Sequence, residues 1–484
     1  MKRKLLLLLF SIFSIGVSLA QPTTEDVLNM LVNEHVIKSE KVDSLRADIA
    51  VEQQKTPKDK TFTVDVDFRT RSEIRSGYGK LRNDTSHAAT FTNQRSRIMM
   101  TYKQEGKFIF HTSFQDIRVW GNAAQKSTAG TVQIFEAWVQ PFITPKLSVK
   151  IGKQKLAFDN QRLFAENDWR PQSGTHDAFN LVYRGSKLSS DLAFAFNQNA
   201  QDINTAEEYF GTSYNNAATY KALGVSYLKW NASERWTLSA INSAEGLQTT
   251  KVGESKEKMY MRYTDGGRIE YEKGRWYFTT AAYLQSGWLA SGKKVTAWYV
   301  QPEIKYTANS VTIRLGAEVF SGDDARHPIS NNSVDHNFNT LYGVAHRFNG
   351  NMEFFTQKPA NLSNAGMINP YLFFVKRIGK KVELKADFHT FYSENNYVVT
   401  TTTSPYFKKG ALVPKYLGFE NDLLLSFFPN AFTKIDLGAS YAIATHAMSE
   451  ILSKSDGYYG NTNMIPTWYY VSLSFKPQLF KYKF

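Results

Sequence analysis

The chain has 484 residues and no cysteine, and it combines 34 Phe, 26 Tyr and 9 Trp with a mean hydropathy of −0.39. The absence of cysteine excludes disulfides and a lipid-modified N-terminal cysteine. Of the formal net charge of +14, residues 1–20 contribute +3 and residues 21–60 contribute −2, which leaves about +13 in residues 61–484. Such a surplus is typical of proteins that meet acidic polymers or small anions.

Residues 1–20 predict a secretory signal peptide. A basic KRK start precedes the apolar run LLLLLFSIFSIGV, and SLA at residues 18–20 has the small residues of a cleavage site. The apolar run is short for a membrane anchor, and polar chain follows it at once. Because an exported protein rarely meets nucleic acid, we expect an anionic saccharide or a small anion as the partner, and no nucleic acid.

Residues 21–60 predict a helical leader that lies in the periplasm. TTEDVLNMLV carries apolar residues at helical spacing, and VDSLRADI repeats that spacing after Ser39, a candidate N-cap. We expect a short helical hairpin or coiled segment here. The alternative is a partly disordered leader.

From residue 61 onward the apolar side chains follow a period of two. Phe62, Val64, Val66 and Phe68 alternate with polar residues, and the same alternation returns at 108–111, 191–196, 311–319 and 381–388. One apolar face and one charged face, repeated through the rest of the chain, indicate an all-β membrane protein. We expect a single antiparallel transmembrane β-barrel with a polar lumen over residues 61–484.

The connections between these strands alternate in length. Short ones are predicted at 104–106, 141–146, 184–189, 229–235, 272–274, 306–310, 377–381 and 427–432. Longer polar stretches lie at 76–93, 156–177, 199–218, 246–258, 322–368, 394–414 and 446–464. Short periplasmic turns and long extracellular loops, with both chain ends in the periplasm, predict about eighteen strands. A further hairpin within residues 341–355 would raise that number by two.

Aromatic residues mark the membrane boundaries and the end of the chain. Trp120, Trp138, Trp230, Trp236, Trp276 and Trp288 fall near predicted strand ends, as in aromatic girdles. WYYVSLSF at 468–475 alternates and the chain ends on Phe484, which resembles the assembly signal of bacterial outer-membrane proteins. The barrel assembly machinery and outer-membrane lipid are therefore expected partners. Because Pro477 cannot donate to a ladder, we expect the last strand to stop near Lys476, leaving 478–484 as a tail.

Signatures of catalysis are absent from the sequence. It contains no GxSxG, HExxH or phosphate-binding loop, and its nine His lack metal-ligand spacing. We expect neither an enzyme, nor a cofactor, nor a metal site.

Two strands carry rows of arginine on one face. FRTRSEIR places Arg69, Arg71, Glu73 and Arg75 on the lumen side of the first strand, and NQRSRIMM places Arg95 and Arg97 on the second. Across one ladder they would form a basic wall, offset by Glu73, Glu136, Glu318, Asp387, Glu420 and Asp422. Each arginine has two interpretations. It binds an anionic solute through its planar donors, or it is a structural lock paired to a carboxylate.

A second cluster lies around residues 151–183. It comprises Lys150, Lys153, Gln154, Arg162, Asp168, Trp169, Arg170 and Asp177. Cations suit the carboxylate of a sugar acid, and an aromatic face suits the C–H groups of its ring. We therefore expect Lys150, Gln154 and Trp169 beside the arginines at the pore.

The order of these motifs resembles the alginate export family. The resemblance rests on RxRxExR, the G-K-Q-x-L…R…W-R…D-A-F block, SGDD at 321–324, FNTLYGVAHRFNG at 338–350 and LGFEND at 417–422. The best-known member is an eighteen-stranded outer-membrane channel whose arginine-rich lumen conducts alginate. The leader is more similar to that of Bacteroidota porins.

The resemblance implies roles for individual residues. Arg69, Arg71, Arg95, Arg97, Arg162 and Arg170 would line an electropositive constriction, with Glu73, Asp168 and Glu420 as pairing carboxylates. Asp323, His346 and Arg347 would belong to an extracellular loop folded over or into the pore.

The sequence thus predicts a channel in the outer membrane of a Gram-negative bacterium. We expect it to pass an anionic solute, a uronate polymer or oligomer, by passive diffusion. The alternatives are a general anion or phosphate-type porin without polymer specificity, and a plugged barrel whose loops bind partners. Neither the direction of transport nor the oligomeric state follows from the residues.

Overall fold

The computed structural model describes residues 59–122, 131–197, 220–254, 258–326, 334–355 and 365–484. The predicted signal peptide and the helical leader, residues 1–58, lie outside these ranges. Among the described residues, no helix is long and apolar enough to cross a membrane.

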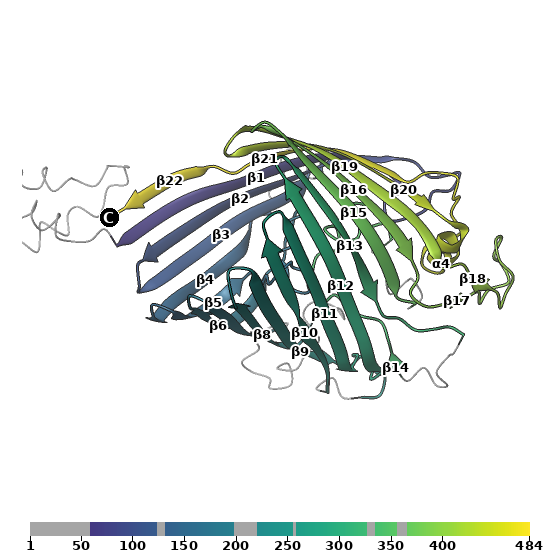
Figure 1. Ribbon diagram of the computed structural model, residues 1–484, viewed down its shortest axis with the longest axis horizontal. Helices are drawn as coiled ribbons and strands as arrows, with labels where there is room; N and C mark the ends of the chain where they lie inside the picture. Colours follow the sequence, from purple (N-terminus) through teal and green to yellow (C-terminus); the bar gives the residue numbers. More distant parts are fainter. Residues whose placement is uncertain (1–58, 123–130, 198–219, 255–257, 327–333, 356–364) are drawn as a thin grey trace, which may run out of the picture. The chain divides into compact units, whose positions relative to one another are not determined.

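Eighteen antiparallel strands form one closed β-barrel, as the alternation predicts. The first nine are β1 (Lys60–Ser76), β2 (Ala89–Gln104), β3 (Phe108–Val119), β4 (Gln133–Thr144), β5 (Leu147–Gln154), β6 (His176–Arg184), β7 (Leu188–Phe196), β8 (Ala222–Asn231) and β9 (Trp236–Gln248). The other nine are β10 (Met259–Lys273), β11 (Trp276–Trp288), β12 (Lys294–Ala308), β13 (Val311–Phe320), β15 (Met367–Ile378), β16 (Val382–Tyr392), β19 (Tyr416–Asn430), β20 (Thr433–Ala444) and β21 (Thr467–Phe475). Each strand pairs with the next along the chain, and β1 closes the barrel on β21 (Figure 1).

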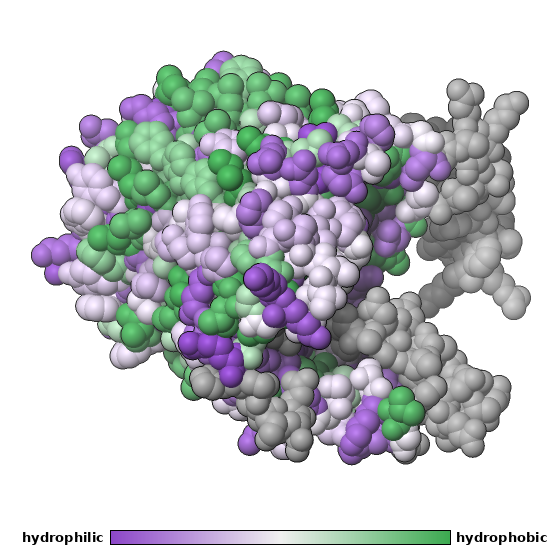
Figure 2. All heavy atoms as spheres, turned by 90° about the vertical axis from the view of Figure 1, so that its right-hand side faces the viewer, coloured by the Kyte–Doolittle hydropathy of each residue, from purple (hydrophilic) through white to green (hydrophobic). Residues whose placement is uncertain are grey.

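Four short strands and a helix complete the described elements. They are β14 (Val334–Asp335), β17 (Tyr397–Val398), β18 (Leu412–Val413), α4 (His446–Asp456) and β22 (Gln478–Lys483). The helix α4 begins where the Thr445 side chain accepts the Met448 N–H, and it ends at Gly457, whose φ is 75°. Figure 2 views the end of the barrel that carries α4; hydrophilic side chains are spread over it and apolar ones gather along its upper margin.

The two faces of the strands differ as expected for a barrel in lipid. Ile98 of β2 is 50% exposed on the outer face, whereas its neighbour Arg97 points inward and is 2% exposed. The predicted short connections fall at the turns between β2 and β3, β4 and β5, β6 and β7, β8 and β9, β10 and β11, β12 and β13, β15 and β16, and β19 and β20.

The end of the chain differs from the prediction. Residues 478–484 are not a free tail, because β22 resumes pairing with β1 beyond Pro477. The Pro477 carbonyl accepts the Val66 N–H, and Lys60 and Phe484 exchange both backbone hydrogen bonds. A proline carbonyl remains a good acceptor although its nitrogen donates nothing, so the strand is interrupted rather than ended.

The extracellular half of the lumen is filled by loops. Leu156, Leu163 and Phe164 of the loop 155–175 belong to one apolar cluster with Tyr283 and Tyr299 of the wall. Residues 341–355 contribute Met352, Phe354 and Phe355 to the same cluster. The possible extra hairpin at 341–355 is therefore an inward-folded loop, and the number of barrel strands stays at eighteen.

Trp138 also differs from its expected place. It lies on the lumen face of β4, where its ring stacks on His111 at 5.0 Å and its Nε1–H donates to Glu136. Trp120, Trp230, Trp236, Trp276 and Trp288 are exposed on the outer face.

Candidate functional site

The loop 155–175 crosses the lumen from one wall to another. On the side of β8 and β9, the Asp159 carboxylate accepts hydrogen bonds from Tyr227 and Ser239, at 2.8 and 2.7 Å. On the side of β2, Arg95 Nη1 donates to Asp168 Oδ1 at 2.7 Å. The loop therefore contacts both the β2 side and the β8–β9 side of the lumen.

A second loop, 334–355, packs onto the first. Tyr342 forms a parallel bridge with Phe164 of the loop 155–175. Arg162, which is 2% exposed, lies against Glu318 of β13 at 2.9 Å and donates to Asn349 at 2.7 Å. One buried arginine therefore joins both loops to the wall.

Two predicted pairing carboxylates have other partners. Glu420 accepts the backbone N–H of Met352, and Asp422 accepts that of Asn351. Both carboxylates are buried on β19 and hold the tip of the loop 334–355. The prediction that they pair with arginines is therefore wrong, because backbone N–H groups of the loop donate to these carboxylates instead.

The arginines of β1 and β2 form a compact wall of ion pairs. Arg69 stands directly opposite Arg95 in the ladder. Arg71 and Arg75 share Glu73, at 2.8 and 2.7 Å. Arg95 contacts both Asp67 and Asp168, at 2.6 and 2.7 Å. Like charges that face each other are thereby offset by carboxylates.

Several predicted contact residues are enclosed in the wall or its loops. Arg97 donates to Gln115 and lies 3.6 Å from the centre of the Phe135 ring. Gln154 is fully buried and donates to three backbone carbonyls, of Lys150, Gly152 and Ala178. Arg95 and Arg162 are 1% and 2% exposed, so these two side chains are likewise enclosed by protein.

Four further predicted residues lie in three places. Lys150 lies over the Trp138 ring at 4.0 Å, and Glu136 pairs with Lys155 at 3.6 Å. Arg170 is largely exposed and lies 3.3 Å from Glu353. Asp323 accepts the His336 N–H in the loop that follows β13. None of these four lines the cavity described next.

A cavity of about 470 Å³ lies between the loops and the periplasmic turn of β19 and β20. Its lining combines Arg69, Arg71, Arg347, Lys434 and Lys476 with Asp168 and Asp436, the rings of Trp169, His346, Phe428, Phe432 and Tyr470, and the smaller Ala431, Thr433, Ser472 and Ser474. Cations thus outnumber carboxylates in this cavity.

Aromatic rings surround one of these cations. Trp169 stacks on His346 at 4.7 Å with their planes 15° apart. The Arg71 guanidinium lies 4.9 Å from the centre of Trp169 and 5.9 Å from that of Tyr470. Such contacts orient the guanidinium, and its Nη1 also donates to the Trp169 carbonyl at 3.3 Å.

Arg347 differs from the other cations of the cavity. It is exposed, and within the described part of the chain it forms neither a hydrogen bond nor an ion pair. Lys434 and Lys476, by contrast, contact Asp436 and Asp67, at 2.9 and 3.2 Å.

Two loop residues at the cavity have shifted pKa values. Burial would raise the pKa of Asp168, but Arg95, Arg69 and Lys476 outweigh it and hold that pKa below the ordinary 3.8. Burial and the neighbouring Arg347 and Lys385 hold the pKa of His346 well below 6.5. At neutral pH, Asp168 is therefore an anion and His346 a neutral ring.

Sequence reasoning missed four lining residues. Lys434, Asp436 and Tyr470 sit on lumen positions of β20 and β21, and Lys476 directly follows β21. The alternation of apolar and polar residues is the signal that could have placed them inward. What it could not supply was the strand pairing that gathers them around Asp168. No group of three or more potential metal ligands occurs among the residues that the structure describes.

Comparisons with known proteins agree with this architecture. A family model described as alginate export matches residues 59–451. The chain belongs to the alginate export family. No curated protein matches it.

Solved outer-membrane proteins of Pseudomonas aeruginosa share the fold of this family member. OpdK, solved with vanillate, is similar with a TM-score of 0.53 and 12% identity over 88% of this chain and 99% of its own. OccK3 (OpdO) has a TM-score of 0.54 and 11% identity over 87% and 96%. OprD has a TM-score of 0.51 and 11% identity over 86% and 94%. The chain is an outer-membrane β-barrel.

Proposed function

We propose that this alginate-export barrel passes an acidic saccharide, a uronate oligomer or polymer, by passive diffusion. The observation that carries the proposal is the cavity that joins Arg69, Arg71 and Arg347 to the rings of Trp169 and Tyr470. Guanidinium groups meet a carboxylate through paired donors, and a flat ring meets the C–H face of a sugar.

The balance of charges in the cavity favours passage over trapping. Most cations are already paired. A carboxylate would therefore meet the guanidinium of Arg347, which has no partner among the residues that the structure describes, and several partly engaged cations. Distributed and moderate attraction lets an anion enter and then leave, as conduction requires.

Planar-bilayer recordings test the proposal. The wild type is expected to prefer anions, and a uronate oligosaccharide is expected to block its current where a neutral oligosaccharide of equal length does not. Trp169→Ala and Arg347→Ala should each weaken that block. Lys408→Ala, on the exposed loop between β17 and β18, serves as the control and should leave it unchanged.

Other outcomes would identify other functions. Anion preference with block by phosphate and none by the uronate would favour a general anion porin. A preference for cations, or an equal block by the neutral oligosaccharide, would contradict the proposal.

A further inference from the structure

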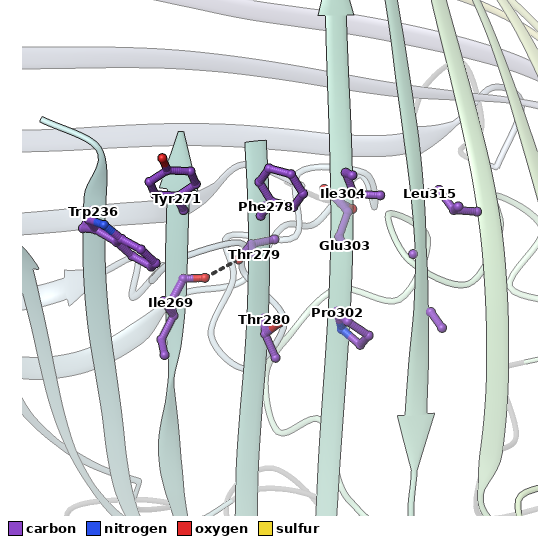
Figure 3. A pocket seen from close by; sticks show the side chains of 12 residues that line it. Trp236, Ile269, Tyr271, Phe278, Thr279, Thr280, Pro302, Glu303, Ile304 and Leu315 are labelled. Carbon is purple, nitrogen blue, oxygen red and sulfur yellow. Dashed lines mark hydrogen bonds between the residues drawn. The ribbon is translucent and has the colours of Figure 1, made fainter. Parts of the chain in front are cut away.

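The outer wall of the barrel carries a groove that is separate from the lumen. It has a volume of about 710 Å³ and runs across β9 to β13 (Figure 3). Trp236, Tyr271, Phe278, Ile304 and Leu315 form one bulky row, because each is the ladder partner of the next. The volume is in the range of about 300–1,000 Å³ that is usual for small-molecule sites.

The floor of the groove is the next row of the same wall. Thr280 pairs with Pro302, and Ala317 pairs with Pro370 of β15. Thr280, Pro302 and Ala317 are smaller than the side chains of the bulky row, so the wall is lower there. Ile269, the ladder partner of Thr280, closes this row on the side of β10. In Figure 3, Tyr271 and Phe278 lie nearer the strand ends, and Thr280 and Pro302 lie farther along the strands, facing the same groove.

Proline also explains why the wall is locally irregular. The pairing of β12 with β13 skips Gln301 and Pro302, between Val300–Val319 and Glu303–Gly316. Pro302 has no N–H to donate, so this ladder is open at a residue that lines the groove. In an ordinary strand, a larger β-branched or aromatic side chain at this position would fill the space above the wall.

The groove ends at a cationic rim near the periplasmic turns. Lys273 follows Tyr271 by two residues on β10, so it shares the outer face. Arg235 and Arg275 stand in the adjoining turns, and all three cations are exposed. Glu234 and Glu272 lie in the same turns, but no ion pair joins them to these cations in the described residues.

From this arrangement we propose that the groove and its rim bind an anionic phospholipid of the periplasmic leaflet. One acyl chain would lie on Thr280, Pro302 and Ala317, beside the bulky row. The phosphate would meet Lys273, Arg235 and Arg275. Charge complementarity at the rim selects a phospholipid over an uncharged apolar partner, and the position of the rim at the short turns selects the inner leaflet.

Native mass spectrometry of the detergent-solubilised barrel with added phosphatidylglycerol or phosphatidylethanolamine tests the proposal. The wild type is expected to retain phosphatidylglycerol about tenfold more strongly, since two or three cations lie near the headgroup. The double variant Lys273→Glu/Arg275→Glu should lose that preference. Lys107→Glu, in the turn between β2 and β3, should keep it.

Filling the groove should remove both lipids. Ala317→Phe places a ring on the floor, and Thr280→Phe does so from β11 if the first variant fails to fold. The matched control is Ala439→Phe on the outer face of β20, away from the groove. A heat-modifiable shift in gel mobility shows that each variant is folded.

Three results would overturn the proposal. The first is equal lipid retention by Ala317→Phe and Ala439→Phe, and the second is a preference for lipid A, which belongs to the other leaflet. The third is self-association through this face. Because the chain has no native cysteine, the variant Thr280→Cys carries a single thiol. Efficient cross-linking of two copies of this variant in bilayers would show self-association.

Discussion

Arg162 illustrates how a single residue can hold three elements together. Its guanidinium contacts Glu318 of β13, the Val344 carbonyl and Asn349, and almost no solvent reaches it. Arg162→Ala would leave the Glu318 carboxylate buried without its cation. We expect the free energy of unfolding to fall by about 3–5 kcal/mol, measured from the denaturant midpoint of the heat-modifiable gel shift.

The double variant Arg162→Met/Glu318→Leu is the control for this pair. It removes both charges and keeps apolar volume, so most of the lost stability should return. A single variant as stable as the wild type would show that the pair does not anchor the loops.

Asp168 makes the crossing of the lumen depend on pH. Its pKa lies below the ordinary 3.8, mainly because Arg95 outweighs the effect of burial. A carboxyl group whose pKa is lowered by folding stabilises the folded loop when the pH is above the pKa of the unfolded chain. This stabilisation is lost as the pH falls through the lower pKa of the folded state. We therefore expect single-channel conductance to stay constant from pH 7 to about pH 4 and to rise only in stronger acid.

Asp168→Asn removes the anion at every pH and should give the raised conductance at pH 7. Asp323→Asn, a carboxylate in the neighbouring loop that touches neither Arg95 nor Arg69, should behave as the wild type. If the wild-type channel opened between pH 7 and pH 5, another group would have to hold the loop.

The residue types at this site were predictable from the sequence, but their pairing was only partly so. A period of two places Arg69, Arg71 and Glu73 on one face, and the ladder then fixes Arg69 opposite Arg95. Which arginine remains free depends on distant loops. Arg162 and Glu318 are 156 positions apart in the sequence, and no local sequence pattern predicts their contact.

At the scale of the element, the loop 334–355 is held to the wall through its own backbone. Gly350 has a φ of 87°, and a Cβ at this position would clash with Glu420 Oε1. Gly350→Ala therefore adds a strained backbone and a clash with a buried carboxylate. We expect the tip of the loop to leave β19 and single-channel conductance to rise.

Gly379→Ala separates the two causes. Gly379 also has a positive φ, 63°, but a Cβ there would meet nothing within 4 Å. This variant in the turn between β15 and β16 should lose some stability, about 1 kcal/mol, and keep the wild-type conductance. Equal conductance in both variants would contradict the anchoring of the loop by β19.

The loops mark the limit of the alternation signal. Short turns were placed correctly because strand length and turn residues are local properties. The residues 341–355 also alternate enough to suggest a hairpin, yet Met352 and Phe354 are buried in the lumen. Apolar residues that cover a loop and those that face lipid look alike in a sequence, and the long-range packing decides between them.

At the scale of the whole molecule, closure of the barrel was predictable and its manner was not. The alternation in WYYVSLSF identifies the closing strand, but Pro477 suggests an end where the structure has an interruption. Beyond Pro477, the ring centres of Phe480 and Phe62 are 6.2 Å apart, and those of Phe484 and Tyr102 are 6.3 Å apart. β22 thus covers the edge that the start of β1 would otherwise expose.

Deletion of residues 478–484 should therefore weaken the barrel without opening it. The pairing of β1 with β21 over Phe68–Phe475 to Ser76–Thr467 would remain, whereas residues 61–65 would lose their partners on β22 and keep only those on β2. Each lost backbone hydrogen bond contributes about 0.5–1.5 kcal/mol, so the refolded variant should unfold at clearly lower denaturant than the wild type. Lys481→Ala/Lys483→Ala keeps the backbone of β22 and should unfold like the wild type. The variant is refolded in vitro so that the measurement reports the stability of the barrel separately from its assembly in the cell. An unchanged unfolding midpoint in the purified barrel would show that β22 adds nothing to closure.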